Sequence, residues 1–244
     1  MMNRKFHGFC LGSGKTGTAS VASMFQRFRS AHEPMPALTN QIVIEYDKQD
    51  LKPNVAQRLL RCRDDDLQLE MDASHPLGFI PKLLARTFPN SKFLITVRHP
   101  LEWVKSRMAY HLAVDPPAWR PFRQHFWRNR PEDYSIHDEY LATTYHLCPL
   151  DAYLGVYEEQ YTRLWNETPY DQAIIVKTES LSNSHALKKI AQFFEVPYKH
   201  LVKSHLNKTN KLRVDPSSLL TDDYIMDRSN AICHRALETY HAAI

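Results

Sequence analysis

A glycine-rich turn near the start of the chain has the composition of an anion-binding loop. Four of the six glycines in the 244 residues lie between Gly8 and Gly17. The segment Gly12–Thr18 (GSGKTGT) follows a short apolar run and precedes an amphipathic stretch, so it joins an expected strand to an expected helix. Glycines let backbone N–H groups curl round an anion, Lys15 adds charge, and threonine hydroxyls add donors. The expected ligand is therefore a phosphate or sulfate group; a plain tight turn is the alternative.

This loop does not have the spacing of a Walker A motif. The motif G-x-x-x-x-G-K-[ST] would need a glycine at position 9, which is Phe9. Read from Gly12, the sequence is instead G-x-x-K-[ST]-G-T. The residues expected to bind the anion are Gly12, Ser13, Gly14, Lys15, Thr16, Gly17 and Thr18. A kinase or NTPase stays open as an alternative function, and it would need a Walker B aspartate, for which Asp72 is the only near fit.

A second pattern follows the clearest strand of the sequence. Lys92–Val97 (KFLITV) leads directly to Arg98, and Ser106 comes eight residues later, two turns along the next expected helix. Arginine offers a planar fork to a dianion and serine offers a short hydrogen bond. Both would lie at the carboxyl edge of the sheet. In the alternative, Arg98 pairs with a carboxylate and Ser106 is solvated.

Together the two motifs resemble those of the sulfotransferases that use 3′-phosphoadenosine 5′-phosphosulfate (PAPS), over about Phe6 to Pro197. The resemblance implies that Gly12–Thr18 holds the 5′-phosphosulfate and that Arg98 and Ser106 hold the 3′-phosphate. Ala19 departs from the family because it replaces a second hydroxyl of the loop. The R-K-G segment of cytosolic animal members is absent, and Lys208, in a basic segment, either does that work or is solvated.

Sulfuryl transfer also needs a base that takes the acceptor's proton, opposite the leaving phosphate. Asp72 and His75 follow the second expected strand, and Glu33 follows the first expected helix. Each alone suits a structural role, but one of the three is expected to be the base, with Asp72 and His75 slightly ahead of Glu33. A carboxylate that orients a histidine would also fit. Lys15 is expected to stabilise charge in the transition state.

The resemblance implies an enzyme with PAPS as co-substrate and with no metal, because cationic side chains can carry the developing charge. The acceptor would be a hydroxyl or amine of a small molecule, a carbohydrate or a lipid. A non-catalytic nucleotide-binding module is the alternative outside enzymes, and the oligomeric state stays open.

Strands alternating with helices predict an α/β fold with a central, mainly parallel sheet between helical layers, like that of P-loop NTPases. The expected strands are Phe6–Leu11, Leu67–Met71, Lys92–Val97 and Gln172–Lys177. The expected helices are Thr18–Phe28, Leu77–Thr87, Leu101–Leu112, Ser184–Phe194 and Asp222–Ala243. Residues 1–244 are expected to form one domain, with lid loops at 115–135 and 198–216.

The composition is that of a globular protein, with 43% hydrophobic and 24% charged residues. A net charge of +4 is too small to indicate nucleic acid binding, so we expect no nucleic-acid partner. The four cysteines are scattered, which favours a reduced, cytoplasmic protein. No apolar run is long enough to predict a transmembrane segment.

Overall fold

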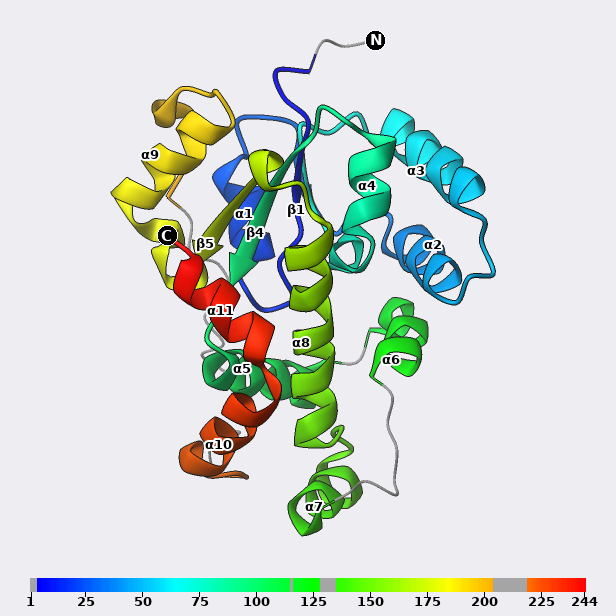
Figure 1. Cartoon of the computed structure of the whole chain (residues 1–244), viewed down its shortest axis with the longest axis vertical. Helices are drawn as coiled ribbons and strands as arrows, with labels where there is room; N and C mark the ends of the chain where they lie inside the picture. Colours follow the sequence, from blue (N-terminus) through cyan, green and yellow to red (C-terminus); the bar gives the residue numbers. More distant parts are fainter. Residues whose placement is uncertain (1–3, 115, 128–134, 204–218) are drawn as a thin grey trace.

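One parallel sheet organises the chain (Figure 1). In this computed structural model, which describes residues 4–114, 116–127, 135–203 and 219–244, the strand order is β2-β3-β1-β4-β5. The strands are β1 (Gly8–Cys10), β2 (Ser30–His32), β3 (Met71–Ala73), β4 (Lys92–Val97) and β5 (Ala173–Lys177). Cys10 pairs with Ala73 on one side and with Leu94 on the other. The residues that follow β1, β2 and β3 therefore emerge at the same edge of the sheet.

Helices connect the parallel strands, as crossover connections must. The α-helices are α1 (Thr18–Met24), α2 (Pro36–Asp47), α3 (Pro53–Leu67), α4 (Pro81–Thr87), α5 (Pro100–Ala113), α6 (Arg120–Phe126), α7 (Ile136–Tyr145), α8 (Leu150–Glu167), α9 (Ser184–Phe193), α10 (Asp222–Ile232) and α11 (His234–Ala242). Shorter 3₁₀ turns are η1 (His75–Phe79), η2 (Pro117–Trp119), η4 (Tyr170–Gln172), η5 (Thr178–Ser182) and η6 (Tyr198–His200).

Both faces of the sheet are covered by helices. Because side chains alternate along a strand, Phe9 and Phe93 belong to one buried cluster, whereas Cys10 and Leu94 belong to the other. The first cluster includes residues of α2, α3, α4 and α8, and the second includes residues of α1 and α9. Figure 1 shows α9 and α4 on opposite sides of the strands. The predicted α/β fold with a parallel sheet between helical layers is confirmed.

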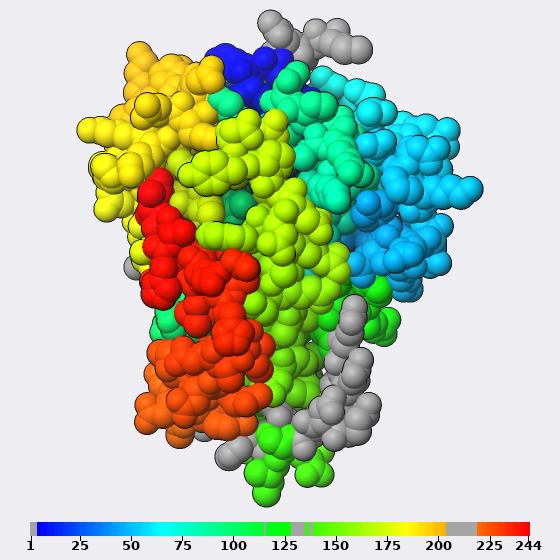
Figure 2. All heavy atoms as spheres, viewed as in Figure 1, coloured from blue at the N-terminus to red at the C-terminus, as the bar shows by residue number. Residues whose placement is uncertain are grey.

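Helix α8 holds the carboxyl ends of the strands in place. Tyr157 and Tyr161 lie one turn apart on its buried face. The Tyr161 hydroxyl donates to the Thr96 carbonyl oxygen at 2.5 Å, and the Tyr157 hydroxyl donates to that of Arg98 at 2.6 Å. Helices α10 and α11 pack along the same helix, as Figure 2 shows. The chain thus leaves β4 along a path fixed by buried hydrogen bonds.

The expected strand over Leu67–Met71 is wrong in its boundaries. Helix α3 continues to Leu67 and ends where Gln68 adopts a left-handed backbone with φ of 49°. Strand β3 therefore begins only at Met71. The helix expected over Leu77–Thr87 is divided at Pro81, which begins α4 because proline lacks the N–H that would continue the preceding turn.

Two other expectations differ from the structure. Within the expected loop 115–135, residues Arg120–Phe126 form a helix whose Phe122 and Phe126 are buried, so this part is packed core rather than a loop. The helix expected over Asp222–Ala243 is divided at Cys233, whose φ and ψ of −92° and 52° are not helical. Among the helices in the described ranges, none has the length and apolar character needed to cross a membrane.

Candidate active site

The loop between β1 and α1 is curled tightly against the end of β4. A Cβ built on Gly12 would lie 1.9 Å from Thr96 Oγ1, so only glycine fits there. The Thr16 hydroxyl donates to the Ser13 carbonyl oxygen at 2.6 Å and lies 2.8 Å from Thr96 Oγ1. Gly17, with φ of 97°, precedes the first residue of α1. The predicted loop therefore has a fixed conformation set by buried hydrogen bonds.

The two threonines of the loop make contacts within the protein. Besides the contacts of Thr16, the Thr18 hydroxyl lies 3.1 Å from His32 Nε2. The hydroxyls of Thr16 and Thr18 are therefore already engaged within the protein. Among the described residues, the ammonium group of Lys15 contacts only an aromatic ring, so Lys15 is the side chain of the loop best suited to bind an anion.

Lys15 lies in a cationic environment. Its backbone φ of 78° is unusual for a residue with a side chain and costs on the order of 1 kcal/mol. Burial, followed by the charges of Arg107 and Arg98, lowers the pKa of Lys15. Its Nζ lies 5.0 Å from the centre of the Tyr110 ring, and within the described ranges it forms no ion pair with a carboxylate. An anion at this position would relieve the repulsion among the three cations.

Arg98 follows β4, as predicted. Its backbone N–H donates to the Tyr157 hydroxyl at 3.2 Å, so the backbone is held by α8. Its guanidinium is about a third exposed and lies 3.5 Å from the Glu102 carboxylate, one turn along α5. An exposed pair of this kind adds little stability, so Arg98 can exchange Glu102 for a ligand at low cost. Ser106 lies two turns along α5 and is half-buried.

Arg107, the neighbour of Ser106, is not among the residues predicted from the sequence. Its side chain is only 7% exposed and lies close to the loop, because a Cβ built on Gly14 would be 2.6 Å from Arg107 Nη1. A signal was present: in α5, Arg107 is the one charged residue that shares the buried face with Trp103, Val104 and Met108. A cation on an otherwise apolar helix face indicates either an ion pair or a binding site.

Glu33 and His75 form a pair at the carboxyl edge of the sheet. Glu33 Oε1 lies 2.5 Å from His75 Nδ1, and His75 is only 4% exposed. Burial alone would raise the pKa of Glu33, but the charge and hydrogen bond of His75, with the charges of His32 and Arg107, together outweigh it, and the pKa is lowered. Burial lowers the pKa of His75, although Glu33 opposes this shift. The arrangement is therefore a neutral histidine held by a carboxylate.

His75 lies next to the loop. A Cβ built on Gly14 would be 3.5 Å from His75 Cε1. The ring of Trp119 stacks on the imidazole, with centres 4.7 Å apart and planes 18° apart. His75 Nε2 is buried and has no hydrogen-bond partner in the described part of the chain. One ring nitrogen is therefore held by Glu33, while the other is available to a ligand.

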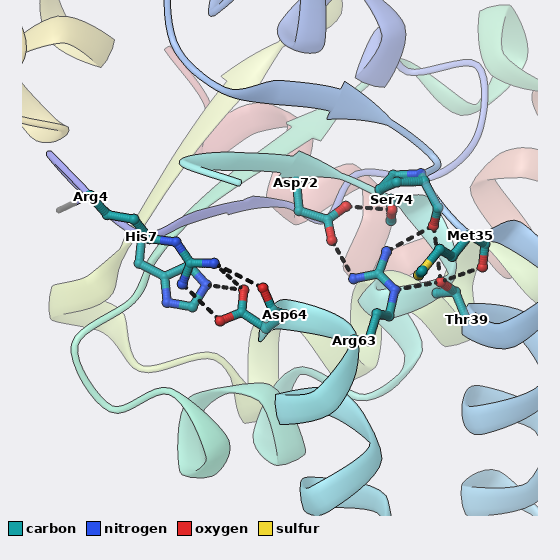
Figure 3. A network of polar contacts seen from close by, with 9 residues as sticks. Arg4, His7, Met35, Thr39, Arg63, Asp64, Asp72 and Ser74 are labelled. Atoms are coloured by element: carbon teal, nitrogen blue, oxygen red, sulfur yellow. Dashed lines mark hydrogen bonds and ion pairs between the residues drawn. The ribbon is translucent and has the colours of Figure 1, made fainter. Parts of the chain in front are cut away.

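Asp72 is engaged elsewhere (Figure 3). Its Oδ2 accepts from Arg63 Nη1 at 2.5 Å, and its Oδ1 accepts from the Ser74 hydroxyl at 2.5 Å. Arg63 also donates to Thr39 Oγ1 and to the Pro34 carbonyl oxygen, so it links α3 to β3 and to the start of α2. Both oxygens of Asp72 therefore have structural partners, which favours His75 and Glu33 as the reacting pair.

Side chains of α5 and α8 hold the backbone of the loop and of His75 in place by hydrogen bonds. The Trp103 indole N–H donates to the Gly14 carbonyl oxygen at 2.8 Å. Gln160 donates to the carbonyl oxygens of Leu11 and His75, at 3.3 and 3.0 Å, and so connects the loop to His75. Lys208 and the rest of the basic segment lie outside the described residues.

A family model described as a sulfotransferase domain matches residues 9–211. Among solved structures, the chain is similar to a sulfotransferase from Alicyclobacillus acidocaldarius, with 17% identity and a TM-score of 0.49 over 99% of this chain and 100% of that one. It is also similar to the sulfotransferase domain of the Synechococcus PCC 7002 olefin synthase, with 14% identity and a TM-score of 0.49 over 99% and 95% of the two chains. No curated protein sequence matches the chain.

Proposed function

The chain belongs to the sulfotransferase family, and we propose that it moves a sulfuryl group from PAPS to a hydroxyl or amine of a small-molecule, carbohydrate or lipid acceptor. The observation that carries this proposal is that His75 lies next to the loop. A Cβ built on Gly14 would be 3.5 Å from His75 Cε1. A base and an anion-binding loop are thereby adjacent, as transfer between a bound donor and an acceptor requires.

The residues present suit a donor with two anionic ends. When bound, PAPS supplies an activated sulfuryl group and leaves adenosine 3′,5′-bisphosphate after transfer. We assign the 5′ end to the Gly12–Thr18 loop with Lys15, and the 3′-phosphate to Arg98 and Ser106. Lys15 supports the first assignment because the charges of Arg107 and Arg98 repel its own charge. A bound anion would reduce this repulsion. Lys208 stays a candidate for the 3′-phosphate.

Lys15 also suits a role in the chemical step. A cation at the loop stabilises the negative charge that develops on the oxygens of the transferring group and its leaving group. Because Lys15 is partly desolvated, its charge acts there more strongly than it would in water.

His75 is our candidate for the general base, with Glu33 as its partner. Since the pKa of Glu33 is lowered, Glu33 is ionised at neutral pH and accepts the Nδ1–H of His75. That hydrogen bond assigns the remaining lone pair to Nε2, which can take a proton from the acceptor. Glu33 then stabilises the imidazolium.

We also propose a reducing, cytoplasmic setting. All four cysteines, Cys10, Cys62, Cys148 and Cys233, are free thiols, and this supports the proposal.

A comparison of nucleotides tests the proposed function. Adenosine 3′,5′-bisphosphate should raise the melting temperature, whereas ATP with magnesium should raise it much less, and EDTA should change neither effect. Transfer of labelled sulfate from PAPS should then be detected in an acceptor screen. Stabilisation by ATP and magnesium that EDTA abolishes would indicate a kinase instead. Bisphosphate binding without transfer to any acceptor would indicate a binding module.

A further inference from the structure

Three side chains beyond the loop present buried nitrogen atoms for which the described residues offer no partner. We call Arg107, His111 and Trp127 the Arg107 cluster. The guanidinium carbon of Arg107 lies 5.0 Å from the centre of the Trp127 ring, and the rings of His111 and Trp127 are 5.0 Å apart. Throughout the described ranges, Arg107 Nε, His111 Nε2 and Trp127 Nε1 lack a hydrogen-bond partner. Such atoms are rare in native proteins and call for an explanation.

The charge of Arg107 is only partly compensated: the charge of Glu33 acts on it without an ion pair. Arg107 is 7% exposed and forms no ion pair with any carboxylate of the described residues. Burial lowers its pKa, yet an arginine in a protein stays protonated. The aromatic rings of Trp127 and Tyr110 contact the cation, at 5.0 and 5.8 Å, but a ring face replaces only part of the lost hydration. A buried cation of this kind is typically matched by an anion.

The other members of the cluster add neutral donors. His111 Nδ1 lies 2.8 Å from the Tyr153 hydroxyl, which leaves Nε2 as the open ring nitrogen. Burial, then the charges of Arg107 and Arg123, lower the pKa of His111 to about 2, so the ring is neutral. A buried cation with an indole N–H and an imidazole beside it, and with the charge of Arg123 acting on both, suits a planar anion that accepts several hydrogen bonds.

Arg107 lies beside the loop on the same side as His75, our candidate for the base. A Cβ on Gly14 would meet both Arg107 Nη1, at 2.6 Å, and His75 Cε1, at 3.5 Å. In an in-line transfer the base is opposite the leaving phosphate, so a group beside the base faces the acceptor. Because the anionic ends of the donor are assigned to Lys15 and to Arg98 with Ser106, we assign an anion bound by Arg107 to the acceptor.

We infer that the Arg107 cluster binds a carboxylate of the acceptor, so that the substrates are hydroxy acids. This inference rests on the proposed function. The carboxylate pairs with the guanidinium of Arg107 and accepts hydrogen bonds from Trp127 and His111, while the acceptor hydroxyl lies at His75 Nε2. Neutral alcohols of the same shape would leave the buried cation unpaired and are therefore poor acceptors.

Pairs of hydroxy acids and their carboxamides test the inference. Wild-type protein saturated with adenosine 3′,5′-bisphosphate is titrated with 4-hydroxyphenylacetate, mandelate and glucuronate, and with the amide of each, while tryptophan fluorescence is followed. At least one acid should bind ten times more tightly than its amide, and with PAPS it should be sulfated in preference. Arg107→Gln should weaken binding of that acid about tenfold, to the level of the amide. Trp127→Phe, which keeps the ring and removes the N–H, should weaken it about fivefold.

The matched control is Lys105→Gln, which removes one positive charge from the same helix at an exposed pair with Asp222. It should leave acid binding unchanged. All variants should bind adenosine 3′,5′-bisphosphate within threefold of wild type. Amides that bind as tightly as the acids, or an Arg107→Gln variant that loses the bisphosphate instead, would overturn the inference and leave the proposed function intact. Wild-type protein that fails to bind the bisphosphate would overturn the proposed function itself.

Discussion

Glu33 Oε1 lies 2.5 Å from His75 Nδ1, although the two residues are 42 positions apart in the chain. The contact is possible because β2 and β3 are parallel neighbours, so the residues that follow them emerge side by side. Glu33 has a left-handed φ of 50° at this turn, directly after β2. The pair thus depends on sheet register rather than on any local motif.

Replacement of His75 should remove turnover without removing donor binding. His75→Gln is expected to lower kcat/KM by about 10²–10⁴-fold, because the acceptor proton loses its base. The dissociation constant of adenosine 3′,5′-bisphosphate should stay within threefold of wild type. His7→Gln is the matched control, since His7 lies 3.2 Å from a carboxylate oxygen of Asp64 (Figure 3). Wild-type turnover in His75→Gln would eliminate His75 as the base.

The pH profile should report the environment of His75. Because burial lowers the pKa of His75, kcat/KM should stay constant as the pH falls through 6.5, the ordinary pKa of histidine. It should decrease only at lower pH. In Glu33→Gln the carboxylate that raises the pKa of His75 is lost, so the acid limb should move to still lower pH. Steady-state kinetics between pH 4.5 and 8 measure the acid limb of kcat/KM in wild type and in the variant. An unchanged limb in Glu33→Gln would contradict the pairing.

The same shifts predict how stability depends on pH. The pKa values of His75 and Glu33 are both lowered in the folded protein, so the unfolded chain binds more protons below their ordinary values of 6.5 and 4.5. Their contribution is therefore complete above pH 6.5 and is lost as the pH falls. Urea unfolding across this range should show the loss in wild type and a smaller one in a His75→Gln, Glu33→Gln double variant. If the unfolding free energy of the double variant depended on pH as steeply as that of wild type, this account would be contradicted.

Two glycines should respond to alanine in opposite directions. Gly12→Ala places a Cβ 1.9 Å from Thr96 Oγ1 and 2.5 Å from the Thr96 carbonyl oxygen, and should destabilise the fold by about 1–3 kcal/mol. For Gly155, inside α8, a built Cβ would meet no atom of the described residues within 4 Å apart from its own helix backbone. Gly155→Ala should therefore stabilise the protein by about 0.5–1 kcal/mol. Chemical denaturation measures both, and a stable Gly12→Ala variant would contradict the described loop.

Asp72 should behave as a structural residue. Asp72→Asn leaves Arg63, which is 3% exposed, without its ion-pair partner and should cost about 3–5 kcal/mol of unfolding free energy. The more exposed Arg4–Asp64 pair in Figure 3 is the control, and Asp64→Asn should cost about 1 kcal/mol. Below its unfolding transition, Asp72→Asn should keep the wild-type acid limb of kcat/KM. A folded Asp72→Asn variant that has lost turnover would identify Asp72 as the base.

Local patterns were enough to predict the loop and the strand to which we assign the donor. The loop at Gly12–Thr18 and the strand Lys92–Val97 each combine a clear periodicity with distinctive residue types. The three-residue strand β2 was missed because only its backbone pairing marks it: its side chains are partly exposed and too few to show alternation. Helix α8 was missed although its tyrosines recur every fourth residue from Tyr153 to Tyr161.

The remaining features of the site depend on long-range contacts. Sequence could not choose among Glu33, Asp72 and His75, because the choice turns on Arg63, which reaches Asp72 from α3. Arg107 was missed because the motif directed attention to Ser106. Successive residues of a helix are rotated by about 100°, so the side chains of Ser106 and Arg107 face different surroundings.

A calorimetric titration of adenosine 3′,5′-bisphosphate and adenosine 5′-phosphate tests the donor site most directly, with wild type, Lys15→Ala and Arg98→Ala. We predict that Lys15→Ala weakens binding of both nucleotides, whereas Arg98→Ala weakens the bisphosphate at least tenfold more than the monophosphate. Equal losses for the two nucleotides in Arg98→Ala, or full affinity in both variants, would contradict the claim that a single nucleotide spans the loop and Arg98.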